Sequence, residues 1–325
     1  KKKVDGSMKI GKEAQKAIKI GVLCAVSYFA VYIVRNVLGA VTPQMVEAGY
    51  TEAYIGSVSS LYFVAYAVGQ LINGAIGDRI KAKYMISFGL ILAGVTNLIF
   101  PYFLHNQVAA KFIYGMTGFF LSMIYGPMTK VVAENTNPIH TVRCSLGYEV
   151  ASLLGSPFAG IIASVLVWNS VFIVGSVSLF TMGALCIAFF TYFERKKIVK
   201  YGQFEHIRAE KNKDKSFFGK IGVLIKHRII IFSLVAIITG VIRTTVVFWL
   251  PTYFSQYLGY DAQVAPRIFT IATLIISLSA FVAVFVYERL NRNMDATMLI
   301  MFTLSTLFFL GVYFVTNPII NVGFI

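Results

Sequence analysis

Residues 20–44, IGVLCAVSYFAVYIVRNVLGAVTPQ, hold a single charged side chain, Arg35, in an otherwise apolar or small-polar stretch. A helix of this length can cross the ~30 Å hydrocarbon core of a bilayer, which needs ~20 residues. Eight further stretches of the same kind follow. The nine predicted membrane spans are 20–44, 53–76, 84–104, 108–129, 143–167, 170–193, 229–257, 265–287 and 296–316. The pattern predicts an all-α membrane protein.

The composition of the whole chain agrees with this prediction. Apolar residues make up 57% of it and charged residues 13%, and its mean hydropathy is +0.73. A water-soluble domain carries about 25% charged residues. So few charges cannot coat a protein of 325 residues for water, so we expect a lipid bilayer as the surrounding partner.

The net charge of +15 is unevenly distributed between the predicted spans. Alternate links, beginning with the N-terminal segment, carry 25 of the 29 Lys and Arg residues, whereas the opposite links carry only Lys111 and Arg267. This bias is typical of cytoplasmic loops, so it predicts a cytoplasmic N-terminus in a multi-pass protein of the plasma (inner) membrane. A nucleic-acid-binding face would not alternate with every span, and we expect no nucleic acid partner.

The chain also repeats itself. Arg35 precedes Pro43 by eight residues, and Arg243 precedes Pro251 by the same number. Because six spans separate the two copies, they keep the same orientation in the membrane. Parallel repeats of this kind are expected for two halves that bind a substrate at their interface.

A second pair of matching positions supports the repeat. The link after the second span contains Asp78-Arg79, and the link after the eighth contains Glu288-Arg289. The predicted segments are an N-terminal cytoplasmic segment (1–19), a six-helix half (20–193), a cytoplasmic linker (194–228) and a partial second half with helices seven to nine and the start of a tenth (229–325). We expect residues 1–7, KKKVDGS, to be a remnant of cloning or of an upstream fusion.

Two arginines are predicted to lie deep in the membrane. Arg35 follows Lys19 by 16 residues and Arg243 follows Arg228 by 15, so both lie ~23 Å beyond a basic anchor. An arginine at this depth costs at least ~2.5 kcal/mol. Each could be held by buried carbonyl groups or by an acid, but a symmetric pair favours a function. Because the planar guanidinium binds carboxylate or phosphate oxygens in pairs, the pattern indicates a site for a small organic anion.

Tyrosines accompany the first arginine. Tyr28, Tyr32 and Arg35 are spaced by four and then three residues, so they share one face of a helix, and Tyr62 and Tyr66 lie one turn apart in the next span. Their hydroxyl groups could orient an oxyanion, although the chain has 18 tyrosines and any one of them could be a bulk aromatic residue.

Glu149 is the remaining ionisable residue well inside a predicted span. It follows Arg143 by six residues, ~9 Å along a helix. A carboxylate at this depth is either paired or protonated. A fixed salt bridge, a switchable proton site and a substrate contact all remain open.

Enzymatic chemistry is not predicted. The three cysteines and four histidines show no metal-ligand spacing, and there is no nucleophile–base pair and no Walker motif. We expect no catalytic residue, no metal and no cofactor.

Three stretches carry a family resemblance: SYFAVYIVRN (27–36), AYAVGQLINGAIGDRIKAK (65–83) and VIRTTVVFWLPTYF (241–254). They resemble helices one, two and seven of the organophosphate:phosphate antiporters of the major facilitator superfamily, such as the glycerol-3-phosphate and hexose-phosphate transporters. The resemblance implies the major facilitator fold, a monomer, and exchange of phosphorylated metabolites for inorganic phosphate.

The resemblance also assigns roles to individual residues. It implies that Arg35 and Arg243 clasp the phosphate. It implies a gating role for the superfamily's Gly-x-x-x-Asp-Arg loop, which is present here as Gly74, Asp78 and Arg79. The repeated Glu288-Arg289 pair is expected to act in the same way.

The chain departs from the family pattern at four positions. Asn36 and Gln70 occupy positions where family members carry lysine, Ser152 replaces an auxiliary histidine of helix five, and Glu149 is an added acid. We expect Ser152 to keep a substrate contact. The departures leave two alternatives open: a proton- or sodium-coupled carboxylate symporter, and a non-transporting sugar-phosphate sensor.

Overall fold

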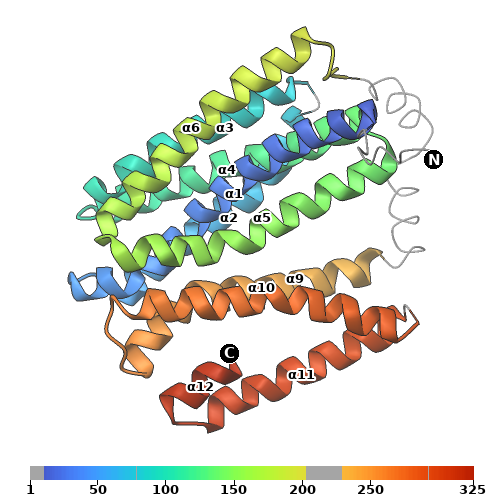
Figure 1. Ribbon diagram of the computed structural model, residues 1–325. Coiled ribbons are helices and arrows are strands. Elements are labelled where there is room, and N and C mark those ends of the chain that lie inside the picture. Colours follow the sequence, from blue (N-terminus) through green and yellow to red (C-terminus); the bar gives the residue numbers. More distant parts are fainter. Residues whose placement is uncertain (1–10, 78, 203–228, 292) are drawn as a thin grey trace, which may run out of the picture.

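The computed structural model describes residues 11–77, 79–202, 229–291 and 293–325, which form helices joined by short loops (Figure 1). The long helices are α1 (Lys12–Glu47), α2 (Glu52–Gly77), α3 (Ala82–Ile99), α4 (Gln107–Asn135), α5 (Pro138–Val165), α6 (Trp168–Arg195), α9 (Ile229–Thr252), α10 (Ala265–Arg289) and α11 (Met294–Phe314). Three short helices complete these residues: η1 (Phe100–Phe103), η2 (Tyr253–Tyr257) and α12 (Pro318–Phe324).

Nine helices in the described residues are long and apolar enough to span a membrane, as the sequence predicts. Several extend beyond the predicted spans. α1 begins at Lys12 rather than at residue 20, because a helix can continue into water while its lysine stems lie along the apolar surface. The predicted link 130–143 is reduced to two residues. The Asn137 side chain accepts a hydrogen bond from the His140 amide, and Pro138 starts α5 directly after it.

The helices form two groups. The first group contains α1 to α6, in which α2 packs on α4, α1 on α5, and α3 on both α4 and α6. The second group contains α9 to α12 and contacts the first through α1 with α9 and α5 with α10 (Figure 1). We call the end of the bundle where α1 begins the basic end, and the other the opposite end.

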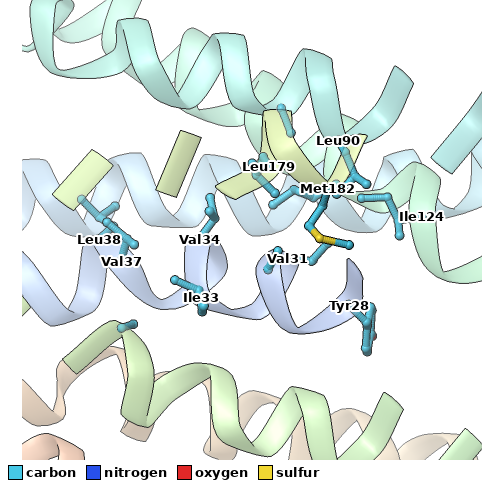
Figure 2. Close-up of a cluster of buried hydrophobic side chains, with 14 of the residues drawn as sticks. Tyr28, Val31, Ile33, Val34, Val37, Leu38, Leu90, Ile124, Leu179 and Met182 are labelled. Carbon is cyan, nitrogen blue, oxygen red and sulfur yellow. The ribbon is translucent and has the colours of Figure 1, made fainter. Parts of the chain in front are cut away.

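The core of the first group is apolar and tightly packed. Figure 2 shows Val31 of α1 beside Met182 of α6, and Leu90 of α3 and Ile124 of α4 belong to the same buried cluster. Glycines let the helices approach closely: a Cβ atom added to Gly94 would lie 2.7 Å from the Phe180 ring. The buried Asn97 side chain donates hydrogen bonds to the Phe172 carbonyl and to Ser176 Oγ, and thereby ties α3 to α6.

The two groups meet toward the opposite end. A Cβ atom added to Gly39 of α1 would lie 2.8 Å from the Phe248 carbonyl oxygen of α9, and one added to Gly56 of α2 would lie 3.0 Å from the Trp249 ring. A Cβ atom added to Gly160 of α5 would likewise collide with the Thr270 side chain of α10.

Hydrogen bonds and burial follow the same distribution. Between the described residues of the two groups, Thr270 Oγ1 donates to the Pro157 carbonyl (3.3 Å) and Ser277 Oγ to the Leu153 carbonyl (3.0 Å). The buried residues of α9 and α10 with described side chains cluster at the opposite end, and the two groups lie closer together there than at the basic end (Figure 1). The bundle is therefore closed at the opposite end.

Candidate functional site

Arg35 lies under a cover of aromatic rings. Its guanidinium carbon is 5.0 Å from the ring centroid of Tyr66, 5.3 Å from that of Tyr32 and 5.4 Å from that of Phe63. A cation above aromatic faces is attracted by their negative charge density, which holds the guanidinium in place. Within the described part of the chain, no carboxylate forms an ion pair with Arg35, so its hydrogen-bonding fork has no acidic partner.

The predicted tyrosines gather around this arginine. Tyr28 packs edge-on against Tyr32 at 4.9 Å between ring centroids, and Tyr66 lies parallel to Tyr62 at 6.4 Å. Spacing along each helix predicts the pairs within α1 and within α2, whereas the contact of Tyr66 with Arg35 depends on the packing of the two helices.

Other aromatic members of the site were not predicted. Tyr125 of α4 and Tyr148 of α5 lie 5.5 Å and 6.5 Å from Tyr28, and Phe63 covers Arg35. Tyr125 and Tyr148 come from helices distant in sequence, so no local spacing signals them.

Polar groups next to the rings are partly satisfied. Gln70 Nε2 donates to the Tyr66 hydroxyl at 3.1 Å, and Asn36 Nδ2 donates to the Tyr32 carbonyl oxygen at 2.6 Å. The buried hydroxyls of Tyr62 and Tyr148 have no hydrogen-bond partner among the described residues. Both of these rings are almost fully buried, whereas the Tyr66 ring beside Arg35 is only partly buried.

Arg243 lies on the other group of helices, at the same level as Arg35. It precedes Phe248 by five residues, and Arg35 precedes Gly39, the contact of Phe248, by four. Because α1 and α9 run in the same direction, both arginines lie ~6–8 Å from this contact toward the basic end. The Arg243 side chain is exposed and forms no ion pair in the described residues.

α5 contributes the acid and the serine predicted from sequence. Glu149 is exposed and has no ion pair in the described structure, so the fixed salt bridge considered from sequence is not formed there. Ser152 is buried, and its hydroxyl donates to the Glu149 carbonyl of its own helix at 2.8 Å.

The predicted gating residues lie at the basic end. Gly74 has open space where a Cβ atom would be, and Arg79 is exposed. Asp78 lies outside the described residues. Glu288 and Arg289 are exposed at the end of α10, and the Arg289 guanidinium lies 5.4 Å from the centroid of the Phe285 ring.

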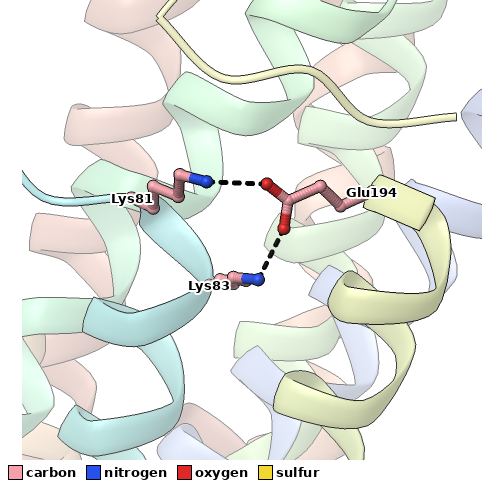
Figure 3. A network of polar contacts seen from close by, with 3 residues as sticks. All are labelled: Lys81, Lys83 and Glu194. Carbon is pink, nitrogen blue, oxygen red and sulfur yellow. Dashed lines mark hydrogen bonds and ion pairs between the residues drawn. The ribbon is translucent and has the colours of Figure 1, made fainter. Parts of the chain in front are cut away.

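An ion-pair network that the sequence did not reveal lies beside this loop. Glu194, at the end of α6, receives hydrogen bonds from Lys81 Nζ at 2.8 Å and from Lys83 Nζ at 2.5 Å (Figure 3). One carboxylate thus links the start of α3 to the end of α6.

The segment after α6 is held against α4. Asn135 Nδ2 donates to the Lys200 carbonyl and Asn135 Oδ1 accepts from the Lys200 amide, both at 2.8 Å, while Glu134 Oε2 accepts from the Gly202 amide at 3.1 Å. Burial raises the pKa of Tyr201. We call residues 198–202 the strap; with Arg79 and Lys130 its end lines a pocket of about 170 Å³.

The described residues contain no group of three or more His, Cys, Asp or Glu side chains that could hold a metal ion. In the part of the chain that the structure describes, the charged groups at the centre are Arg35, Arg243 and Glu149. This arrangement suits the binding of an oxyanion between two helical groups rather than bond-making chemistry.

The sequence profile of the Major Facilitator Superfamily matches residues 24–325. The chain belongs to this superfamily. Its fold agrees: it aligns with the crystal structure of the nucleoside transporter NupG with a TM-score of 0.64, at 13% identity, over 95% of this chain and 77% of that chain. The match confirms the predicted fold class and a family of transporters rather than enzymes.

Distant relatives confirm the narrower resemblance as well. The chain is 22% identical to the glycerol-3-phosphate transporter of Bacillus subtilis over 269 residues, which is 77% of this chain and 60% of that protein. It is 32% identical to the membrane sensor protein UhpC of Salmonella typhimurium over 76 residues, 23% of this chain and 17% of the sensor. The chain therefore spans 60% or less of the length of these two relatives.

Proposed function

We propose that this chain forms the binding site of a secondary transporter for small organic anions, and that phosphorylated metabolites are exchanged for inorganic phosphate by alternating access. The observation that carries the proposal is Arg35, a guanidinium at the centre of the bundle that is held by three aromatic rings and has no acidic partner in the described residues. Arg243 supplies the second cation from the other helical group, at the same level.

The closed opposite end supports alternating access. A substrate that reaches Arg35 in this conformation enters from the basic end, and its release on the other side requires the contacts of Gly39 and Gly160 with α9 and α10 to separate. We propose that residues 20–193 and 229–325 are the moving halves, that 194–228 is a cytoplasmic linker, and that the protein acts as a monomer in the plasma membrane. Labelling of Lys196→Cys by an impermeant thiol reagent outside intact cells would contradict this sidedness.

The test measures binding of glycerol 3-phosphate and of inorganic phosphate to the purified full-length protein. Arg35→Lys and Arg243→Lys keep the charge but lose the fork, so each should weaken binding by at least ~1.5 kcal/mol, about tenfold. Arg267→Lys is the matched control. It changes an exposed arginine in the first turn of α10, so this variant should bind the anion as the parent does. Unchanged affinity in Arg35→Lys would make the arginine structural.

A sensor is a second candidate, favoured by the local similarity to the UhpC sensor. A sensor would bind the anion through the same arginines but would not move it. Uptake into liposomes distinguishes the two functions, because only a transporter accumulates labelled anion in an Arg35-dependent way. A proton-coupled symporter would in addition need a titratable group near the arginines.

A further inference from the structure

Glu149 belongs to a polar stripe on α5. Ser145, Glu149, Ser152 and Ser156 follow one another at intervals of four, three and four residues, so they share one face of the helix. The apolar residues Phe158, Ile161 and Val165 are exposed on another face of the same helix. A polar stripe on a membrane-spanning helix faces the interior of the protein rather than lipid.

The neighbours of α5 place this stripe between the two helical groups. Gly155 packs against Tyr32 of α1, and the Leu153 carbonyl accepts a hydrogen bond from Ser277 of α10. With 3.6 residues per turn, Glu149 projects from the axis of α5 in a direction between those of Gly155 and Leu153. Its side chain therefore points to the space between α1 and α10.

Glu149 lies nearer to the basic end of the bundle than Arg35 does. Gly155 is level with Tyr32, Glu149 is six residues before Gly155, and Arg35 is three residues after Tyr32. The two charges are thus separated by ~13 Å along the helix axes. An anion that moves from the basic end to Arg35 passes the carboxylate.

Among the described residues, the elements packed around Glu149 offer no fixed counter-charge. α1 brings Tyr28, Tyr32 and Arg35 to this region, and α4 brings Tyr125. α10 has no titratable side chain between Arg267 and Tyr287, and α6 has no acidic or basic side chain before Glu194. Within the described ranges, Arg243 of α9 is the other cation at this depth. In the described structure the carboxylate pairs with neither arginine.

We propose that Glu149 couples anion binding to a proton: it is ionised while the arginines are empty and takes up a proton when they hold an anion. The inference rests on the proposed function, because it requires an anion at the arginines. An ionised Glu149 partly neutralises the two cations and repels the entering anion, whereas a protonated one does neither. The affinity should therefore rise as the pH falls, and more steeply for a dianion than for a monoanion.

The experiment uses two probes whose charges are constant from about pH 5.5 to about pH 8: inorganic sulfate, a dianion, and methyl sulfate, a monoanion. Their binding to the full-length protein in nanodiscs is followed by thermal stabilisation across this range. The parent should bind methyl sulfate roughly threefold and sulfate roughly tenfold more tightly at the acidic limit, since the repulsion energy scales with the charge of the anion. Glu149→Gln should bind both at the acidic-limit affinity at every pH.

Two variants serve as controls. Glu149→Asp should keep the pH dependence, and Glu47→Gln, an exposed acid at the end of α1, should behave as the parent does. Arg35-dependent sulfate binding that is independent of pH, or a Glu149→Gln variant with the parental pH dependence, would overturn the inference but leave the proposed function intact. Sulfate binding with the parental affinity in Arg35→Lys would instead contradict the proposed function.

Discussion

At the scale of single residues, two charged side chains of the molecule are held in different ways. Glu194 receives two lysines, so its charge is neutralised within the protein. Arg35 is held by aromatic rings, which fix its position without cancelling its charge. The first arrangement is expected of a structural contact, and the second leaves a cation free to bind an incoming anion.

The Tyr66 hydroxyl is predicted to contribute to binding. It accepts a hydrogen bond from Gln70, so its own proton is free to be donated to an oxyanion on Arg35. Tyr66→Phe keeps the ring over the guanidinium and removes only this donor, which should weaken anion binding by ~0.5–1.5 kcal/mol, measured by titration calorimetry.

Tyr54→Phe is the matched control for this change. The Tyr54 hydroxyl donates to the Leu104 carbonyl at 3.0 Å, near the opposite end, so its removal should lower stability but not affinity. Equal affinity in Tyr66→Phe and Tyr54→Phe would show that the Tyr66 hydroxyl does not touch the anion.

The sequence was sufficient to predict Arg35, Tyr28 and Tyr32 as neighbours, because helical spacing places all three on one face of α1. It was not sufficient for Tyr125 or Tyr148, whose proximity depends on how α4 and α5 pack against α1. The orientation of Arg243 was likewise beyond reach, since it depends on how the second group of helices is placed.

At the scale of elements, the strap after α6 is a feature without a sequence signal. Residues 198–202 have no periodic pattern, yet their backbone is fixed by the side chains of Asn135 and Glu134. The helices themselves were predictable because each apolar stretch needs ~20 residues to cross the membrane. The residues at which the helices begin and end were less predictable, because local capping hydrogen bonds, such as the one to the Asn137 side chain, determine them.

Loss of the strap contact should destabilise the protein. Asn135→Ala leaves the Lys200 amide and carbonyl without their partner, and it should lower the free energy of unfolding by ~1–3 kcal/mol. The midpoint of thermal unfolding of the full-length protein in detergent measures the change. Gln263→Ala, at an exposed position, serves as control, and an equal midpoint in both variants would show that the strap contributes no stability.

The loop between α2 and α3 is predicted to act on conformation rather than on binding. Arg79 follows Tyr66 by 13 residues, so it lies ~20 Å from the arginine site. Arg79→Ala should slow transport by more than it weakens anion binding, because a bias between two access states changes turnover first. Turnover in liposomes and equilibrium binding, measured on one preparation, provide the comparison. A parallel loss of both would argue against a gating role.

At the scale of the whole molecule, the two helical groups are joined at one end by small residues and hydroxyl groups. Thr270 and Gly160 make this junction between α5 and α10, and Gly39 makes it between α1 and α9. Contacts of this type need little side-chain rearrangement to separate, which suits a junction that has to open in every transport cycle.

A disulfide across this junction should block transport. In a background without Cys24, Cys144 and Cys186, the pair Gly160→Cys and Thr270→Cys brings two sulfur atoms into bonding range. Oxidation should abolish uptake into liposomes, reduction should restore it, and sulfate binding from the basic end should persist throughout. Undiminished uptake by the oxidised protein would show that this end stays closed during transport.

The contact between Gly56 and Trp249 has a consequence for genetics. A Cβ atom added at position 56 would lie 3.0 Å from the indole ring of Trp249, and among the described residues no backbone atom of α9 lies within 4 Å of it. Gly56→Leu should therefore be a loss-of-function allele whose revertants carry a smaller side chain at position 249. The suppression should be allele-specific: Trp249→Leu should rescue Gly56→Leu and should fail to rescue a bulky allele at Gly94, whose neighbour is Phe180 instead.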